Sequence, residues 1–174
     1  MKIKKKFIFS RGKIWVLLSD SIKEALKHSN QKYYEYLNKE NPDMEYKIEK
    51  DIDRTFLLKF DKSTKNVRYS NFLNFKEKKK NLFNVLKAYG NIDPEVNYCQ
   101  GANYIVALLL YHLDSERLVF WVFHQIMNKF LWRFIYLNKT PKLIRLIESF
   151  KTTIKTEIKD LDEHFEKFEV FFLY

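Results

Sequence analysis

The chain has 174 residues, of which 46% are hydrophobic and 31% charged, a balance that excludes an intrinsically disordered protein and allows one domain with its own core. Only three glycines and three prolines interrupt it, which is too few turn residues for an all-β protein, so we expect an all-α, multi-helical fold. The net charge of +10 suits an anionic partner, but the lysines are scattered and no nucleic-acid-binding motif accompanies them, so no nucleic-acid partner is expected.

The first predicted helix follows a basic N-terminal segment at residues 1–10, and we interpret residues 11–174 as a single domain. Ser21 and Glu24 have the spacing of a capping box, in which each side chain satisfies the free amide group of the other residue. Apolar residues at helical spacing then continue to Leu37, which predicts one helix from the cap onward.

An Asn-Pro-Asp break at residues 41–43 separates this helix from a short one predicted at about residues 44–52. The polar stretch at residues 62–69 is predicted to be a loop. The next amphipathic pattern predicts a helix that ends at Gly90, because glycine favours the position just after a helix.

A turn at residues 93–94 leads into an apolar helix predicted at about residues 100–113. Asp114 or Ser115 is positioned to cap the helix that follows. The Thr-Pro pair at residues 140–141 predicts a capped start of another helix, and a last amphipathic stretch runs toward the end of the chain.

The single cysteine, Cys99, excludes an internal disulfide and fits a reducing compartment. No secretory signal pattern follows the basic N-terminus, and the longest apolar run, residues 104–113, is too short to span a bilayer. We therefore expect a cytoplasmic protein, with peripheral contact to an anionic endomembrane as a further option.

Two short segments carry side chains with a shared chemistry. Arg54 follows a helix-like stretch with Asp51 one helical turn earlier, and Gln100 stands beside Gly101 at the start of the apolar helix. GTP hydrolysis requires an arginine that neutralises charge on the transferring phosphoryl group and a glutamine that orients the attacking water. Because no glycine-rich phosphate-binding motif occurs, the chain is expected to supply both groups to the GTP of another protein.

Each residue also has a simpler interpretation, in which Arg54 is a solvated surface arginine and Gln100 a polar residue at a helix N-terminus. Other chemical sites are weaker still. The four histidines are widely separated and predict no metal site, and no local signature makes Cys99 a nucleophile.

Three ordered motifs resemble the TBC domain of Rab GTPase-activating proteins. They are R-G-x-x-W from Arg11 to Trp15, I-x-x-D-x-x-R-T from Ile48 to Thr55, and Y-x-Q-G from Tyr98 to Gly101. The resemblance covers the chain from about Arg11 onward but only the first two-thirds or so of a complete TBC domain. Since the chain also stops on an apolar run at residues 169–174, we expect the domain to continue in a longer protein, with its C-terminal helices missing here.

The resemblance implies a TBC-like, all-α domain with a groove for a GTP-bound Rab. Arg54 would be the arginine finger, and Gln100 would replace the glutamine of the Rab in positioning water. Of the neighbouring residues, Asp51 would orient Arg54, Tyr98 would pack beneath the glutamine loop, and Gly101 would allow close approach of the partner. The chain would need no cofactor of its own, because the partner GTPase carries GTP and Mg²⁺.

Three motif residues are expected to be structural rather than catalytic. Arg11 and Trp15 lie one helical turn apart and are expected to anchor the first helix to the core. Ile48 opens the arginine motif as an apolar residue of its helix.

The leading functional hypothesis is therefore a GTPase activator for a Rab in vesicle trafficking. The first alternative is a module of the same fold that binds a small GTPase without accelerating hydrolysis. The second is a basic helical protein that binds nucleic acid or an anionic membrane, which the scattered lysines disfavour.

Overall fold

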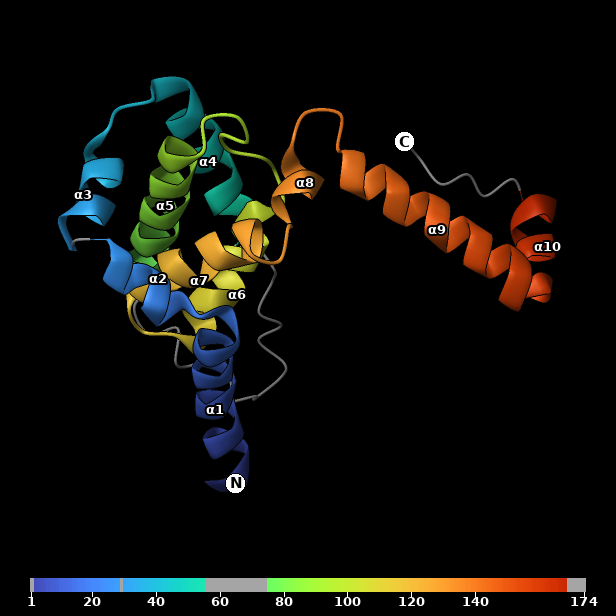
Figure 1. Cartoon of the computed structure of the whole chain (residues 1–174), viewed down its shortest axis with the longest axis horizontal. Helices are drawn as coiled ribbons and strands as arrows, with labels where there is room; N and C mark the ends of the chain where they lie inside the picture. The colour runs from blue at the N-terminus through green and yellow to red at the C-terminus, as the bar shows by residue number, and fades with distance from the viewer. Residues whose placement is uncertain (1, 29, 56–74, 169–174) are drawn as a thin grey trace. The chain divides into compact units, whose positions relative to one another are not determined.

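The structure is a computed structural model that describes residues 2–28, 30–55 and 75–168 (Figure 1). These ranges form helices and turns without any strand, which confirms the predicted all-α class. The chain divides into two compact units, residues 1–131 and 132–174. The loop predicted at residues 62–69 and the terminal apolar run lie outside the described residues.

The helices of each unit follow the chain in order. The first unit contains α1 (Lys2–Ser19), α2 (Ser21–Lys27), α3 (Asn30–Asn38), α4 (Pro42–Thr55), α5 (Phe75–Ile92), α6 (Ala102–His112) and α7 (Glu116–Asn128). The second contains α8 (Arg133–Tyr136), α9 (Pro141–Glu157) and α10 (Lys159–Lys167). No helix within these ranges is both long and apolar enough to cross a membrane.

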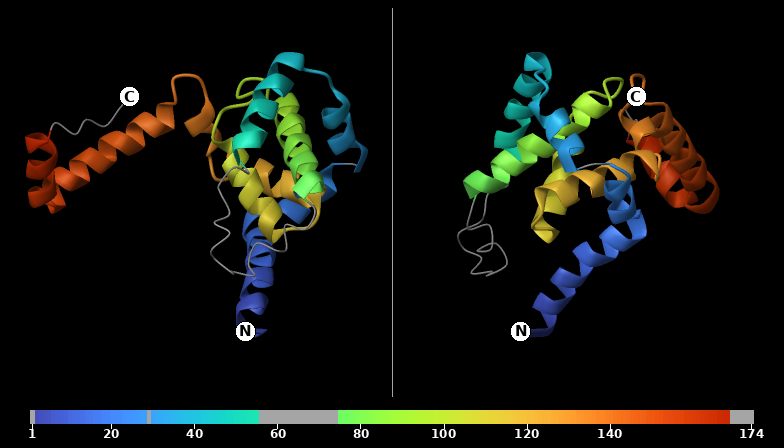
Figure 2. Two further views of the ribbon diagram at one scale, coloured as in Figure 1. Left: turned by 180° about the vertical axis from the view of Figure 1, so that it is seen from behind. Right: turned by 60° about the vertical axis from the view of Figure 1, so that its left-hand side comes forward.

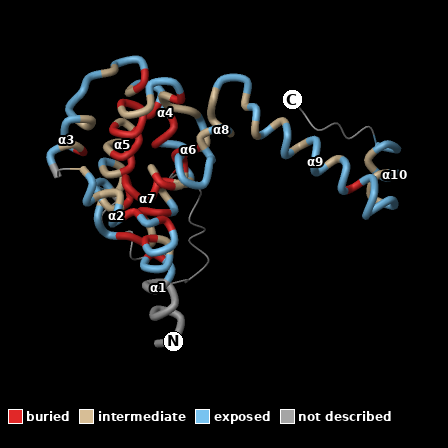
Figure 3. Tube along the Cα trace, in the orientation of Figure 1, coloured by how far each residue is buried: buried red, intermediate tan, exposed pale blue. Residues whose placement is uncertain are grey.

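Helix α5 is the centre of the first unit and packs against α3, α4, α6 and α7 (Figures 1 and 2). Buried residues concentrate where these helices meet (Figure 3). Phe120 and Phe123 of α7 are fully buried, and their rings lie 5.0 Å from Tyr33 of α3 and 4.9 Å from Tyr89 of α5, respectively. This apolar centre forms the support on which α4 and α6 are placed.

Helix α4 is fixed by a buried stripe and by a reciprocal cap. Met44, Ile48 and Ile52 are buried one turn apart, as helical periodicity predicts for residues that face a core. At its start, the Asn41 Oδ1 atom accepts from the Met44 amide at 3.3 Å, and the Asn41 amide donates to the Glu45 carboxylate at 3.0 Å. That amide, together with a nearby lysine, lowers the pKa of Glu45.

The predicted helix end at Gly90 is wrong, because α5 continues two residues beyond it. Gly90 is buried, and a Cβ atom there would overlap Met44 Sδ of α4. The glycine is therefore needed for close packing of α4 on α5 rather than for a helix terminus.

The capping box predicted at Ser21 is also absent. The Ser21 hydroxyl donates instead to the Val16 carbonyl oxygen at 3.3 Å, and the Glu24 carboxylate contacts Lys27 and His28. The single helix predicted from this point is two helices, α2 and α3. Asp20 takes the N-cap position, so Ser21 lies inside the first turn of α2 and does not cap it.

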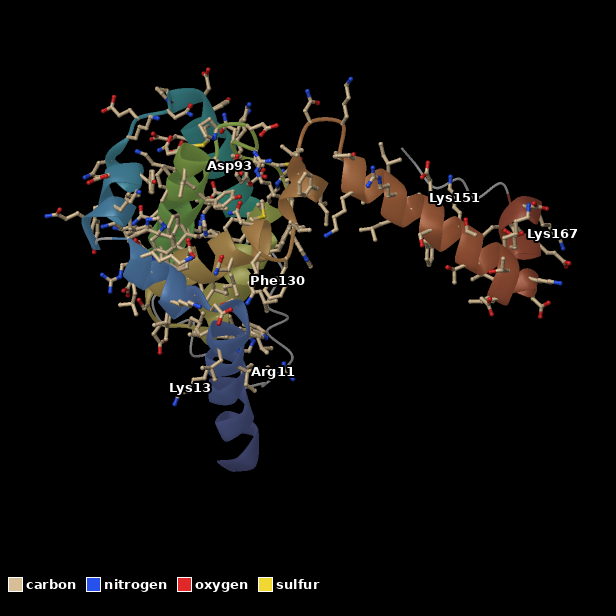
Figure 4. The ribbon with its side chains drawn as sticks, in the orientation of Figure 1. Arg11, Lys13, Asp93, Phe130, Lys151 and Lys167 are labelled. Carbon is tan, nitrogen blue, oxygen red and sulfur yellow. The ribbon has the colours of Figure 1, made fainter. Side chains whose placement is uncertain are left out.

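Helix α1 meets α6 through small and aromatic residues. A Cβ atom at Gly12 would overlap the His112 carbonyl oxygen, and the Trp15 ring lies edge-on to the His112 ring at 4.8 Å. Arg11 is exposed on the same helix (Figure 4). The anchor expected of the first motif is thus made by Gly12 and Trp15, and the segment boundary expected after residue 10 falls inside α1.

The predicted caps at the starts of α7 and α9 have different outcomes. The Ser115 hydroxyl accepts from the Leu118 amide at 3.3 Å, which confirms it as the cap of α7. Pro141 opens α9 as predicted, but Thr140 makes no side-chain cap. Of the described residues in the second unit, only Ile154 is buried.

Candidate functional site

The arginine of the second motif lies in the last turn of α4. The Arg54 guanidinium forms an ion pair with Asp51 Oδ1 one helical turn earlier, the contact that the spacing predicts. The Asp51 side chain is 7% exposed, whereas that of Arg54 is 45% exposed. A buried carboxylate therefore holds the guanidinium of an arginine whose side chain is still partly exposed to solvent.

The second carboxylate oxygen of Asp51 connects α4 to the glutamine motif. The Tyr98 hydroxyl donates to Asp51 Oδ2 at 2.6 Å. Burial, and then the bond to the carboxylate, raise the pKa of Tyr98, so the phenol remains protonated and continues to donate. Tyr98 thus gives the second carboxylate oxygen of Asp51 a hydrogen-bond partner, a role that the sequence did not indicate.

Gln100 lies in the tight turn that enters α6. The Ala102 amide donates to the Cys99 carbonyl at 3.3 Å, and Gly101 adopts φ 102°, a left-handed conformation that glycine permits. The Gln100 side chain is exposed. The turn therefore fixes the backbone on both sides of a glutamine that faces solvent.

A second connection to this turn comes from Thr55, the last residue of the arginine motif, and from Asn103; the sequence indicated no role for either. The Thr55 hydroxyl donates to the Asp51 carbonyl oxygen at 2.5 Å and accepts from Asn103 Nδ2 at 2.6 Å. Asn103 Oδ1 in turn accepts from the Gly101 amide at 2.9 Å. An amide in the first turn of an otherwise apolar helix was the signal that could have identified Asn103.

These contacts close a ring around the two candidate finger residues. The Asp51 side chain bonds Tyr98, two residues before Gln100. The Asp51 carbonyl is linked through Thr55 and then Asn103 to the amide of Gly101, the residue after Gln100. We call this set the α4–α6 corner; it comprises Asp51, Arg54, Thr55, Asn103 and residues 98–101. Figure 2 shows the two helices that contribute to it. The corner presents a permanent cation and a carboxamide on a buried polar base.

The described ranges contain no group of three or more His, Cys, Asp or Glu side chains that could hold a metal ion. Burial, followed by the nearby Asp51 carboxylate, raises the pKa of Cys99. A thiol whose pKa is raised is a poor nucleophile, so Cys99 is not a candidate for nucleophilic chemistry.

The chain matches the family model of the Rab-GTPase-TBC domain over residues 9–174. It is similar to the Ecotropic viral integration site 5 protein homolog of Homo sapiens, with 32% identity over 160 residues, which are 90% of this chain and 18% of that protein. It is also similar to GTPase-activating protein GYP5 of Eremothecium gossypii, with 29% identity over 154 residues, 88% of this chain and 16% of that protein.

The fold resembles the crystal structure of the Chlamydomonas flagellar RabGAP TBC domain with a TM-score of 0.71 and 22% sequence identity. That similarity covers 93% of this chain and 52% of the solved chain. The chain thus spans about half of the solved domain and less than a fifth of the two relatives named above. Because the family model covers both units of the structure, the chain belongs to the Rab-GTPase-TBC domain family.

Proposed function

We propose that the chain accelerates GTP hydrolysis on a Rab-family GTPase by supplying Arg54 and Gln100 in trans. The observation that carries the proposal is the α4–α6 corner itself, where both side chains are exposed while the groups that hold them are buried and hydrogen-bonded to one another. Family membership supports a Rab as the partner, and one relative is named a GTPase-activating protein.

Arg54 would act on the γ-phosphate of the bound GTP. Its guanidinium is planar, permanently charged and able to contact two phosphate oxygens at once. Charge on these oxygens is stabilised as the transition state forms, an effect worth about 10³–10⁵ in rate, or about 4–7 kcal/mol in the barrier. The ion pair with Asp51 keeps the guanidinium near its working position before the partner arrives.

Gln100 would orient the attacking water in place of the glutamine of the GTPase. A carboxamide accepts a hydrogen bond from water through its oxygen and donates to phosphate through its nitrogen. The GTP and its Mg²⁺ are carried by the partner, so the chain contributes positioning and charge only. The GTP-bound Rab would therefore be the substrate on which the chain acts.

A single-turnover hydrolysis assay across a panel of GTP-loaded Rabs tests the proposal. Arg54→Ala is expected to remove about 10³-fold or more of the acceleration, and Arg54→Lys to recover little of it, because lysine cannot bind two oxygens in a fork. Arg117→Ala is the matched control, an exposed arginine on α7 outside the corner. Wild-type acceleration by Arg54→Ala would overturn the arginine assignment.

Binding measurements separate the catalytic proposal from a non-catalytic module of the same fold. The measurement is the affinity of the wild-type chain for Rab loaded with a non-hydrolysable GTP analogue or with GDP. Binding of the GTP-like state together with acceleration supports the activator. Binding without acceleration by any Rab of the panel would favour the module.

The net charge of +10 supports a further, peripheral contact with an anionic membrane, as expected for a regulator of vesicle trafficking. Sedimentation with phosphatidylserine vesicles tests this contact. Binding at low salt that is lost at high salt is expected, because exposed charges are screened within about 10 Å at 0.1 M salt.

A further inference from the structure

The buried connection between α4 and α6 is more specific than packing requires. Asn103 is fully buried and Thr55 is 6% exposed, yet both place polar atoms between two helices. Apolar residues at these positions would fill the same space without the cost of removing polar groups from water. The pair therefore has a use other than burial of surface.

The hydrogen bonds that lead away from the pair end at backbone atoms of the two turns that carry the candidate finger residues. Thr55 directly follows Arg54 and bonds the carbonyl of Asp51, which lies one turn before Arg54. Asn103 bonds the amide of Gly101, which directly follows Gln100. The two side chains meet each other at 2.6 Å, across 48 residues of sequence.

The direction of each hydrogen bond is fixed by its neighbours. The Gly101 amide can only donate, so the Asn103 oxygen must face it and the Asn103 nitrogen must face Thr55. The Thr55 hydroxyl accepts from that nitrogen and gives its own proton to the Asp51 carbonyl. The chain of donors runs in one sense from the Gln100 turn to the Arg54 turn, and no other arrangement satisfies all of its members.

We propose that Thr55 and Asn103 are positioning residues that set the distance and orientation of Gln100 relative to Arg54. The inference rests on the proposed function, since it concerns the placement of the two groups that would act on GTP. Neither residue touches the nucleotide; each acts through the backbone beside a finger residue. Misplacement of a catalytic group by about 1 Å can cost about 100-fold in rate, so a buried polar link of this kind can control the reaction.

The test compares Thr55→Val, which keeps the shape and removes the hydroxyl, with Thr55→Ser, which keeps the hydroxyl. Thr153→Val is the matched control, because Thr153 of α9 also donates to the carbonyl four residues earlier, at 2.9 Å, but is exposed and bonds no asparagine. Asn103→Ala breaks the same link from its other end. Hydrolysis is measured at saturating chain and expressed per folded molecule, with circular dichroism giving the folded fraction.

Thr55→Val and Asn103→Ala are expected to lower the maximal rate by about tenfold to 100-fold while the concentration of chain at half-maximal rate stays within about threefold. Thr55→Ser should restore most of the rate, and Thr153→Val should match the wild type. In the Gln100→Ala background, Thr55→Val should cause little further loss, because residues that act as a unit are not additive. A wild-type maximal rate for Thr55→Val, or a change confined to the half-maximal concentration, would overturn the inference.

Hydrogen exchange of the Gly101 amide separates this inference from the proposed function. In the free protein, Thr55→Val and Asn103→Ala should speed exchange at Gly101 by about tenfold or more, with exchange at the buried Val106 of α6 unchanged. Wild-type exchange at Gly101 would overturn the link whatever the hydrolysis assay shows. Conversely, if the variants exchange faster at Gly101 but the wild-type chain activates no Rab, the hydrogen-bonded link is supported and the proposed function is contradicted.

Discussion

The α4–α6 corner and the core around α5 and α7 use buried residues in opposite ways. In the core, the fully buried side chains are large and apolar, as at Leu82 of α5 and Phe120 of α7. At the corner they are polar, and each reaches a partner in the other helix or in the same turn. The core holds the helices together, whereas the corner determines how two exposed side chains are presented.

A second, partly buried polar cluster shows that pairing alone does not make a site. Tyr33 of α3 donates to Glu116 of α7 at 2.6 Å, and Asn84 of α5 donates to the same carboxylate at 3.1 Å. Burial, followed by the contact with Glu116, raises the pKa of Tyr33. No exposed cation projects from these three residues, so the cluster joins three helices without presenting a reactive group.

Phe120→Ala should give the largest effect and test the core side of the comparison. Removing a fully buried phenyl ring is expected to lower the free energy of unfolding by about 3–5 kcal/mol. Urea unfolding measures it, with Leu26→Ala as control, since Leu26 is 81% exposed and should change stability by less than about 0.5 kcal/mol. The hydrolysis rate per folded molecule should not change, and a reduced rate would show that core and corner are coupled.

Gln100→Ala tests the corner side, where the effect should appear in rate rather than stability. We expect a loss of about 10²–10³ in maximal rate, the usual consequence of removing one preorganised polar group, with unfolding unchanged. Gln31→Ala on α3 serves as the exposed control. The wild-type chain should still accelerate hydrolysis by a Rab whose own catalytic glutamine is changed to leucine. Loss of that acceleration would show that the glutamine of the Rab positions the attacking water and that Gln100 only packs.

Gly90→Ala should cost less than the loss of the phenyl ring. The new methyl group would overlap the buried Met44, and overpacking of this kind costs about 1–3 kcal/mol. Thermal unfolding measures the loss, and Met44→Val in the same chain should recover part of it because the shorter side chain makes room. Equal losses with and without Met44→Val would contradict the packing role of this glycine.

The smallest expected effect is a pH dependence of the core. Burial lowers the pKa of His124, and its ring nitrogen Nδ1 is buried without a hydrogen-bond partner among the described residues. The unfolded chain, with a histidine pKa of about 6.5, therefore binds more protons than the folded chain as pH falls below that value. Stability should be full above about pH 6.5 and decline as pH falls toward the lowered pKa of the folded state, by at most about 1.4 kcal/mol per pH unit.

Urea unfolding between pH 5.5 and 7.5 checks this dependence, and His124→Gln should flatten it. Four charged or titratable groups also act on the His124 ring. Glu24, Lys27 and His28 lie in or at the end of α2, and Asp93 directly follows α5. An unchanged slope in His124→Gln would assign the pH dependence to one of these neighbours.

The predictable parts of the fold depend on neighbours in sequence. The helix predicted at about residues 44–52 and the cap of α7, predicted at Asp114 or Ser115, are local patterns; the structure confirms the helix and makes Ser115 the cap. The contact of Arg54 with Asp51 spans one helical turn and followed from spacing in the same way.

The wrong predictions involve residues with two possible uses. Gly90 suits a helix end or a close helix contact, and only the position of Met44 decides between them. Ser21 suits a cap or a bond to the preceding turn, and the path of the chain between α1 and α2 decides. The Thr55–Asn103 bond joins residues 48 apart, so no local pattern reveals it.

The left-handed backbone conformation of Gly101 favours a D-residue over an L-residue at this position of the glutamine turn. Its φ of 102° and ψ of −27° are the mirror image of a backbone geometry that ordinary L-residues adopt. A D-alanine placed there by chemical synthesis would suit that backbone, whereas L-alanine would strain it. The turn that presents Gln100 can thus be stiffened by inverting one stereocentre, a change that no codon provides.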